Sequence, residues 1–177
     1  MSLKELTAAA HKQAETQPFV RKIFSGNITK EEYATYLINQ ELVYATLEAY
    51  ATTAGLLDDL PGIQRAANIH QDIHELAADI PQLSETKIAQ STDDYLQYLK
   101  TIQTDPAKLM AHIYVRHMGD LYGGQMISKK VPGAGQFYKF DNSDALKTAI
   151  RAKLDDSLAD EALMCFKFAT QLFEELA

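Results

Sequence analysis

Apolar residues recur along this chain with the spacing of an α-helix, and no segment sustains the alternation of a β-strand. Near the start, Ser2 and Glu5 have the spacing of a capping box, and Thr29 and Glu32 repeat it. The residues after the first box form one helical stripe: Leu3, Leu6, Thr7, Ala10, His11 and Ala14. The second box predicts a long helix from about residue 30 to residue 57. The sequence therefore predicts an all-α fold.

Proline, glycine and asparagine divide the helical pattern into segments. Pro18 interrupts the first helix, and a short second helix ends at Ser25–Asn27. The segments expected after residue 57 are a turn at 58–62, a helix to about residue 79, a helix capped by Ser91 or Thr92, a helix opened by Asp105 and Pro106, a loop at 131–135, a short extended piece at 136–140, and two final helices. No repeat or linker divides the chain, so we expect residues 1–177 to form a single-domain helical bundle.

Charge and composition narrow the class of protein. The 177 residues are 46% apolar and 23% charged, as in an ordinary globular domain with a full core. A net charge of −7 argues against a nucleic-acid partner, because phosphate binding needs a basic surface. Cys165 is the only cysteine, which fits a reducing compartment. There is no signal peptide and no run of ~20 apolar residues, so we expect a soluble cytoplasmic protein without a membrane anchor.

Several common catalytic and metal-binding signatures are missing. The chain has no H-E-x-x-H, no Walker loop, no G-x-S-x-G and no histidine with glutamate three residues before it. His70 and His74 have the spacing of two ligands on one helix face, but two imidazoles make an incomplete site. A solvated polar face is the more common explanation for such a pair. Cys165 lies in an apolar helix, where a buried structural thiol is expected.

The sequence GDLYGGQ, residues 119–125, places three glycines inside an expected helix, where each costs about 1 kcal/mol relative to alanine. Gly119 and Gly123 share one helix face, and a face without side chains lets another group approach the backbone closely. Tight packing of a second helix would explain these glycines but not Asp120, an acid that needs water or a hydrogen-bond partner beside them. A flat ligand over the glycines, with Asp120 holding water next to it, explains both.

His11 is a second candidate, because it lies on the apolar stripe of the first helix. A core histidine satisfied by a neighbour is the usual explanation. However, Glu15 lies at i+4, where a carboxylate can orient an imidazole that binds metal through its other nitrogen. Lys4 lies two turns before His11 on nearly the same face, and Lys147 and Arg151 form an i, i+4 cationic pair that could clamp carboxylates. Taken alone, that pair is equally well explained as solvated surface.

Together these residues resemble the haem oxygenase family. The segment AHIYVRHMGDLYGGQMISKK, residues 111–130, is similar to the distal-helix motif of that family. LKELTAAAHKQAE, residues 3–15, is similar to its proximal-helix segment, and QLFEEL, residues 171–176, to its last helix. The similarity spans nearly the whole chain, and the motifs follow the family's order. It implies that haem b is sandwiched between a proximal helix and a glycine-kinked distal helix.

Carried over position by position, the resemblance makes His11 the axial ligand of the haem iron and Glu15 the partner of its imidazole. Asp120 would anchor the water network that delivers a proton to bound dioxygen. Three further residues align with that distal network: Tyr44, Tyr114 and Arg116. The other haem contacts that the resemblance implies are two glycines over the distal face, a third that frees the kink, three groups that neutralise the propionates, and a pocket aromatic: Gly119, Gly123, Gly124, Lys4, Lys147, Arg151 and Phe166.

The chain departs from the family pattern at a few positions. Tyr122 stands where the family often has a small residue, and His117 where it has aromatic or aliphatic residues. Ala8 stands where some members carry a further lysine, which implies weaker propionate binding on that side. The chain is also shorter at Asp58–Gly62 and in the loop at 131–136, and the membrane-anchoring tail of the animal enzymes is missing.

The function implied by the resemblance is oxidative opening of haem to biliverdin IXα, with release of carbon monoxide and ferrous iron. The reaction uses O2 and electrons from an external donor, which the resemblance implies to be a small acidic protein, a ferredoxin. Its docking on a chain of net charge −7 would need local basic residues: Arg21, Lys22, Lys129 and Lys130. One alternative is a haem-binding protein without turnover. Another is a thiaminase-like enzyme, which would need a catalytic cysteine in a polar pocket, and Cys165 fits that poorly.

Overall fold

The computed structural model describes all 177 residues and contains helices but no strand, which confirms the all-α prediction. The α-helices are α1 (Leu3–Glu15), α2 (Pro18–Phe24), α3 (Lys30–Thr53), α4 (Ala66–Ala77), α5 (Gln90–Thr101), α6 (Pro106–Ile127), α7 (Ser143–Arg151) and α8 (Ala159–Leu176). Three short 3₁₀ helices, at Leu83–Glu85, Gln136–Tyr138 and Asp156–Leu158, lie in the connections. No helix combines the length and the apolar character needed to cross a membrane.

Local signals in the sequence start three of the helices as expected. Both capping boxes form at α1 and α3, with the threonine box closed by hydrogen bonds of 3.0 and 3.1 Å between Thr29 and Glu32. Asp105 accepts a hydrogen bond from the backbone N–H of Lys108 at 3.2 Å, with Pro106 in the first turn of α6. Each of these caps satisfies N–H groups that have no partner within the helix.

Three predicted boundaries were wrong, and in each case a distant residue or a glycine explains why. α3 ends at Thr53 instead of residue 57, because Gly55 turns the chain with φ +74°. α5 begins at Gln90, before the expected serine and threonine, because the carboxylate of Glu175 on α8 accepts from its first N–H groups at 2.7 and 2.9 Å. The segment expected to be extended is the 3₁₀ helix Gln136–Tyr138, which Asp72 holds through two backbone N–H groups at 2.9 and 2.8 Å.

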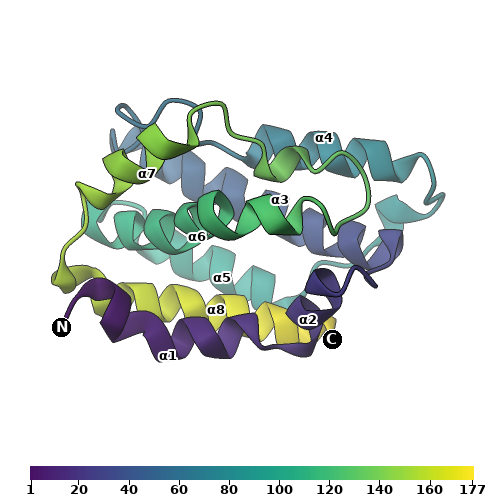
Figure 1. Ribbon diagram of the computed structural model, residues 1–177, viewed down its shortest axis with the longest axis horizontal. Helices are drawn as coiled ribbons and strands as arrows, with labels where there is room; N and C mark the ends of the chain where they lie inside the picture. The colour runs from purple at the N-terminus through teal and green to yellow at the C-terminus, as the bar shows by residue number, and fades with distance from the viewer.

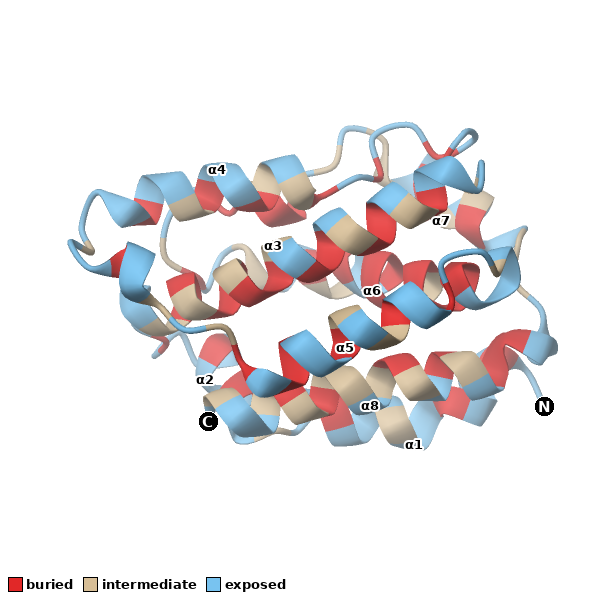
Figure 2. Cartoon of the chain, turned by 180° about the vertical axis from the view of Figure 1, so that it is seen from behind, coloured by how far each residue is buried: buried red, intermediate tan, exposed pale blue.

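Figure 1 shows α1 and α8 running side by side along one edge of the molecule, with α4 along the opposite edge. α8 packs against both α1 and α6, whereas α1 and α6 hardly touch each other. Buried residues recur along α3, α6 and α8, and Figure 2 shows them alternating with half-buried and exposed residues along α3 and α8. α3 and α8 contribute to both clusters of core side chains, and so tie the two ends of the bundle together.

α1 packs on the bundle through a narrower stripe than expected. Leu3, Thr7 and Ala14 are buried, but Leu6 and His11 are exposed. The exposure of His11 excludes the alternative of a core histidine, although the residue belongs to the apolar stripe of the sequence. α8 reaches the imidazole only through Phe166, and the rest of the ring is open to solvent.

Candidate functional site

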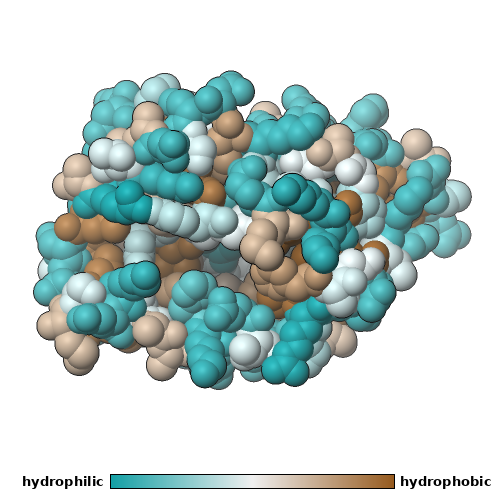
Figure 3. Space-filling view, viewed as in Figure 1, coloured by the Kyte–Doolittle hydropathy of each residue, from teal (hydrophilic) through white to brown (hydrophobic).

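The surface between α1 and α6 is hollowed, and apolar side chains line part of the hollow (Figure 3). Its two sides are α1 and the glycine-bearing part of α6, which are held apart by α8. His11 is exposed on α1, and Gly119 is exposed on α6. The two segments singled out from the sequence therefore face a common space.

The three glycines of α6 serve two different purposes. A Cβ atom added at Gly119 would meet nothing within 4 Å, and one added at Gly123 would meet only the Ile127 side chain at 4.0 Å. No second helix packs on this face, so that explanation of the two glycines is excluded. At Gly124 an added Cβ would lie 2.5 Å from the ring of Tyr138, and Tyr138 is buried. The helix continues through all three glycines to Ile127, and close packing of Tyr138 accounts for the third.

The side of the hollow on α1 presents an imidazole with one carboxylate beside it. Nε2 of His11 lies 3.5 Å from Oε2 of Glu15, and both side chains are more than half exposed. The other face of the ring stacks on Phe166 of α8, with ring centroids 5.5 Å apart and an interplanar angle of 28°. Phe166 thus supports the imidazole from the bundle side, and Nδ1 remains without a protein partner.

Two of the three expected cations lie at one end of the hollow, on α7. The Nζ atom of Lys147 lies 4.3 Å from the centre of the Tyr122 ring, and the guanidinium carbon of Arg151 lies 5.3 Å from it. Lys4, near the start of α1, is exposed. None of the three forms an ion pair within the chain, so all three charges are available to an anionic ligand.

Directly next to the open glycine face, a buried carboxylate and a buried phenol form a close pair. The hydroxyl of Tyr44 on α3 donates to Oδ2 of Asp120 at 2.6 Å. Burial raises the pKa of Asp120 from its ordinary value of 3.8 to about 6, against the opposing effects of His117, the Tyr44 hydrogen bond, Arg116 and Arg65. The pKa of Tyr44 is raised well above its ordinary range, mainly by burial and next by the negative charge of Asp120. Tyr44 therefore keeps its proton and remains the donor.

The second oxygen of this carboxylate is available. Oδ1 of Asp120 accepts no hydrogen bond from the protein, and it is not sealed off from solvent. A carboxylate with one oxygen fixed by a phenol and one oxygen open can bind water in a fixed direction. With a pKa of about 6, it can also gain and lose a proton near neutral pH.

Arg116 lies one helical turn before Asp120 and is also buried. Its Nε donates to the hydroxyl of Tyr95 at 3.1 Å, and Nη1 donates to Oε1 of Gln40 at 3.4 Å. Gln40 in turn donates to the hydroxyl of Tyr36 at 2.7 Å. The guanidinium therefore anchors a polar network beneath the site. Tyr114, the remaining residue expected there, is half-buried and packs against the core cluster, so the structure does not bring it into this network.

Sequence reasoning missed Gln40 and Tyr95 as members of this network. A signal for Gln40 was available, since Tyr36, Gln40 and Tyr44 follow one another at intervals of four residues on one face of α3. Tyr95 had no such signal, because its partner Arg116 is on a different helix. Arg116 and Asp120 are four residues apart on α6, so helix geometry already makes them neighbours on one face.

His117, whose role the sequence left open, belongs to the core and not to the hollow. It is fully buried, and its Nε2 lies 2.8 Å from Oε2 of Glu48. The same carboxylate accepts from the N–H groups of Arg65 and Ala66, at 2.7 and 3.0 Å. Glu48 therefore caps α4, and His117 holds that cap in place.

Other candidates from the sequence do not form sites. Cys165 is fully buried, as expected, in contact with the Tyr95 hydroxyl at 3.4 Å. Burial opposes ionisation of its thiol, but His112 and Arg116 outweigh this and lower the pKa to about 7. A substrate cannot reach that sulfur, which argues against the thiaminase-like alternative. His70 and His74 are exposed, and no three metal-ligating side chains gather anywhere in the chain.

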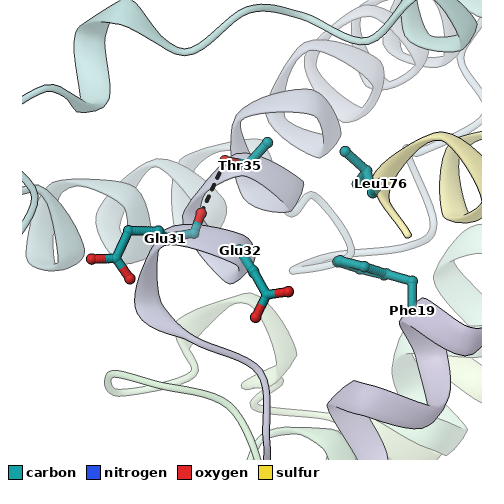
Figure 4. Close-up of a pocket in the computed structure, with 5 residues that line it drawn as sticks. All are labelled: Phe19, Glu31, Glu32, Thr35 and Leu176. Atoms are coloured by element: carbon teal, nitrogen blue, oxygen red, sulfur yellow. Dashed lines mark hydrogen bonds between the residues drawn. The ribbon is translucent and has the colours of Figure 1, made fainter.

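A separate small pocket of about 260 Å³ lies at the far end of the bundle, near the C-terminus (Figure 4). Its lining combines two acids and a threonine from the start of α3 with apolar side chains from α2 and α8: Glu31, Glu32, Thr35, Phe19 and Leu176. Glu32 there already binds Lys22, with Nζ 2.5 Å from Oε2, and caps α3. The pocket shares no residue with the hollow between α1 and α6.

An exposed imidazole, a bare helix face with a tunable carboxylate, and three free cations together define a site for a flat, anionic ligand that carries a metal. The residues fit haem, because no side chain would block the macrocycle at Gly119 and Gly123. They also fit because the donor set offers one imidazole nitrogen to iron and positive charge to two propionates.

Comparisons with known proteins agree with this class. The family model described as "Heme oxygenase" matches residues 1–175. Heme oxygenase 2 of Mus musculus is 29% identical over 98% of this chain, and the chain spans 64% of that relative's length. The chain belongs to the haem oxygenase family.

Solved structures show the same relationship. The crystal structure of heme oxygenase-1 from the cyanobacterium Synechocystis sp. PCC6803, in complex with heme, matches with a TM-score of 0.83 and 27% identity over 98% of this chain and 90% of that one. The heme oxygenase of Leptospira interrogans matches with a TM-score of 0.84 and 27% identity, over 99% of this chain and all of that one. The predicted haem oxygenase type of helical bundle is confirmed.

Proposed function

We propose that this protein is an enzyme that opens haem oxidatively to biliverdin, with release of carbon monoxide and ferrous iron. The observation that carries the proposal is the buried Tyr44–Asp120 pair beside the open face of Gly119 and Gly123. A protein that only stores haem needs a ligand for the iron and charges for the propionates. It has no need of an acid with a raised pKa at the open helix face.

Haem is both substrate and cofactor, and its iron supplies the site at which O2 and electrons react. His11 is the residue that we propose as axial ligand. Oε2 of Glu15 lies 3.5 Å from Nε2 of the imidazole, so the carboxylate would help to orient the ring. The stacking on Phe166 limits rotation of the ring from the other side.

Lys4, Lys147 and Arg151 are proposed to hold the propionates. Their charges are free and they lie on the two helices that border the hollow at one end, α1 and α7. Charge-assisted hydrogen bonds to carboxylates are worth about 1.5–3 kcal/mol each. Such bonds fix the rotation of the macrocycle in its plane, and so decide which meso carbon faces Asp120. We propose that the α-meso carbon takes this position, so that its oxidation gives biliverdin IXα.

Asp120 is proposed as the anchor of the proton supply. Its Oδ2 is held by Tyr44, and its Oδ1 is free to bind water on the side of the glycine face. The carboxyl delivers a proton through that water and does not touch the substrate directly. Arg116 supports the pair through its charge: its guanidinium carbon lies 5.7 Å from the centre of the Tyr44 ring, and it opposes the rise in the pKa of Asp120. We also propose Tyr114 on α6 as a distal residue, although in the structure it packs against the core cluster and makes no hydrogen bond to this network.

A ferredoxin is our proposal for the electron donor. Arg21 and Lys22 lie on α2, which packs against α6, and Lys129 and Lys130 directly follow α6. All four are exposed. Lys22 is paired with Glu32, whereas Arg21, Lys129 and Lys130 form no ion pair and leave local positive charge on an otherwise acidic chain. Turnover should fall as salt rises, and Lys129→Glu should slow it. Turnover that does not depend on salt would contradict a ferredoxin as the donor.

The reducing cellular compartment expected from the single cysteine stays a prediction.

The experiment that tests the proposal is a single-turnover reaction of the haem complex. Haem-loaded protein is mixed with a chemical reductant under O2, and the spectrum is followed while carbon monoxide is trapped. We expect the haem absorbance to be replaced by that of biliverdin, with one carbon monoxide per haem. Retention of intact haem under these conditions would identify the protein as a haem carrier instead.

A further inference from the structure

Tyr122 is an exposed aromatic residue that stands between the two open glycines of α6. Its exposed fraction is 48%, high for a side chain of this size in a helix of the bundle. α6 packs against α7 at this point of the molecule (Figure 1). Two cations lie next to the ring, Lys147 and Arg151, both on α7.

The contacts of these two cations are unusual because no acid takes part in them. Nζ of Lys147 lies 4.3 Å and Cζ of Arg151 lies 5.3 Å from the centre of the Tyr122 ring. Neither side chain forms an ion pair or a hydrogen bond within the protein. An aromatic face attracts a cation without using its N–H groups. The ring therefore holds both side chains in place while all their donors stay free.

We propose that Tyr122 is a positioning residue that fixes Lys147 and Arg151 side by side, and through them the rotation of haem in its plane. The inference rests on the proposed function, since it takes the two cations as the partners of the propionates. Long, flexible side chains lose much conformational freedom when they bind a ligand. A ring that has already ordered them reduces that loss and favours one geometry of the pair.

The consequence for the reaction is selectivity among the meso carbons. Both propionates lie on one edge of haem, so the position of their two partners sets which meso carbon lies beneath Gly119 and Asp120. Lysine offers a rotating point charge, whereas arginine offers a planar fork that can grip a carboxylate with two bonds. If their spacing is not fixed, more than one rotation of the macrocycle becomes accessible, and more than one bilin isomer forms.

The test compares Tyr122→Ala, which removes the ring, with Tyr122→Phe, which keeps the ring and removes only the hydroxyl. The first readout needs no haem. In the apoprotein, proton NMR should show the Lys147 and Arg151 side-chain methylenes shifted upfield by the ring in the wild type and Tyr122→Phe, and at ordinary positions in Tyr122→Ala. The Tyr122 ring is about half exposed and its hydroxyl forms no hydrogen bond, so all three proteins should fold alike.

The second readout uses the haem complexes. We expect Tyr122→Ala to bind haem roughly two- to tenfold more weakly, from one or two lost contacts of this type. It should yield a mixture of bilin isomers, resolved by chromatography, where the wild type and Tyr122→Phe yield one. Equal isomer ratios in Tyr122→Ala and the wild type would overturn the proposal. If the wild type binds haem but forms no bilin, the proposed function fails. Proton NMR of the haem methyl groups then still decides whether Tyr122→Ala populates additional orientations.

Discussion

Gly119 and Gly124 lie five residues apart on α6, and the structure predicts opposite responses when each is changed to alanine. In a helix interior, alanine is more favourable than glycine by about 1 kcal/mol. At Gly119 the new Cβ meets nothing within 4 Å, so the apoprotein should gain that full amount. In a chain of this length, 1 kcal/mol corresponds to a rise in melting temperature of about 2–4 °C.

At Gly124 the same change should be unfavourable. The new Cβ would lie 2.5 Å from Cδ1 and 3.0 Å from both Cβ and Cγ of Tyr138, whose ring is buried and stacked on Phe137. A ring attached this close to the backbone cannot turn away, so the 3₁₀ helix Gln136–Tyr138 has to move. Overpacking of this kind costs about 1–3 kcal/mol, which cancels or exceeds the gain in helix propensity. The Gly124→Ala variant should therefore be no more stable than the wild type, and up to about 2 kcal/mol less stable.

The assay measures urea unfolding of the two variants, first without haem and then with it. Gly119→Ala should be the more stable apoprotein but gain less from haem, because its methyl group occupies the space over which the macrocycle lies. Gly124→Ala should keep its haem affinity, since its change is on the other side of the helix. If Gly119→Ala bound haem as tightly as the wild type, or if its apoprotein were less stable than the wild type, Gly119 would not serve to leave space for haem.

Three further predictions concern single side chains. Asp120→Asn should gain stability relative to the wild type as pH rises from 4 to 7, by roughly 2 kcal/mol in urea unfolding. The reason is that a folded pKa of about 6, against an ordinary value of 3.8, makes ionisation unfavourable in the folded state. A stability difference that stays constant with pH would refute the raised pKa. His11→Ala should leave the apoprotein stable, since the imidazole is exposed, yet lose the histidine-ligated haem spectrum until imidazole is added. Glu175→Ala should lose about 1 kcal/mol as α5 loses its cap, whereas Glu174→Ala, with no such contact, should not.

What the sequence could predict was the part of the structure that depends on neighbours along the chain. The capping boxes, the i+4 relation of His11 to Glu15 and the shared face of Gly119 and Gly123 all follow from helix geometry alone. These local relations singled out the two segments, and the family resemblance implied that the ligand lies between them. The fold class followed from the same periodicity, because one repeating spacing ran through the whole chain.

What the sequence could not predict depends on pairs of residues far apart in the chain. Glu175 caps α5, and Asp72 fixes the 3₁₀ helix at 136–138, across separations of 84 and 64 residues. The ring that lies against Gly124 is that of Tyr138, in the 3₁₀ helix of the connection after α6. Such pairs leave no spacing pattern, so their positions appear only when the fold brings them together. The burial that raises the pKa of Asp120 arises in the same way, from α3 packing on α6.

The measurement that tests the central claim most directly is haem turnover by Asp120→Ala. The iron ligand and the propionate partners proposed here lie on α1 and α7, so the variant should bind haem with wild-type affinity. Without the carboxylate there is no anchor for the water that supplies the proton. In single turnover under O2, we expect little biliverdin, and oxidation of an added phenol in its place. Biliverdin formation at the wild-type rate would show that the Tyr44–Asp120 pair only supports the fold, and would contradict the proposed mechanism.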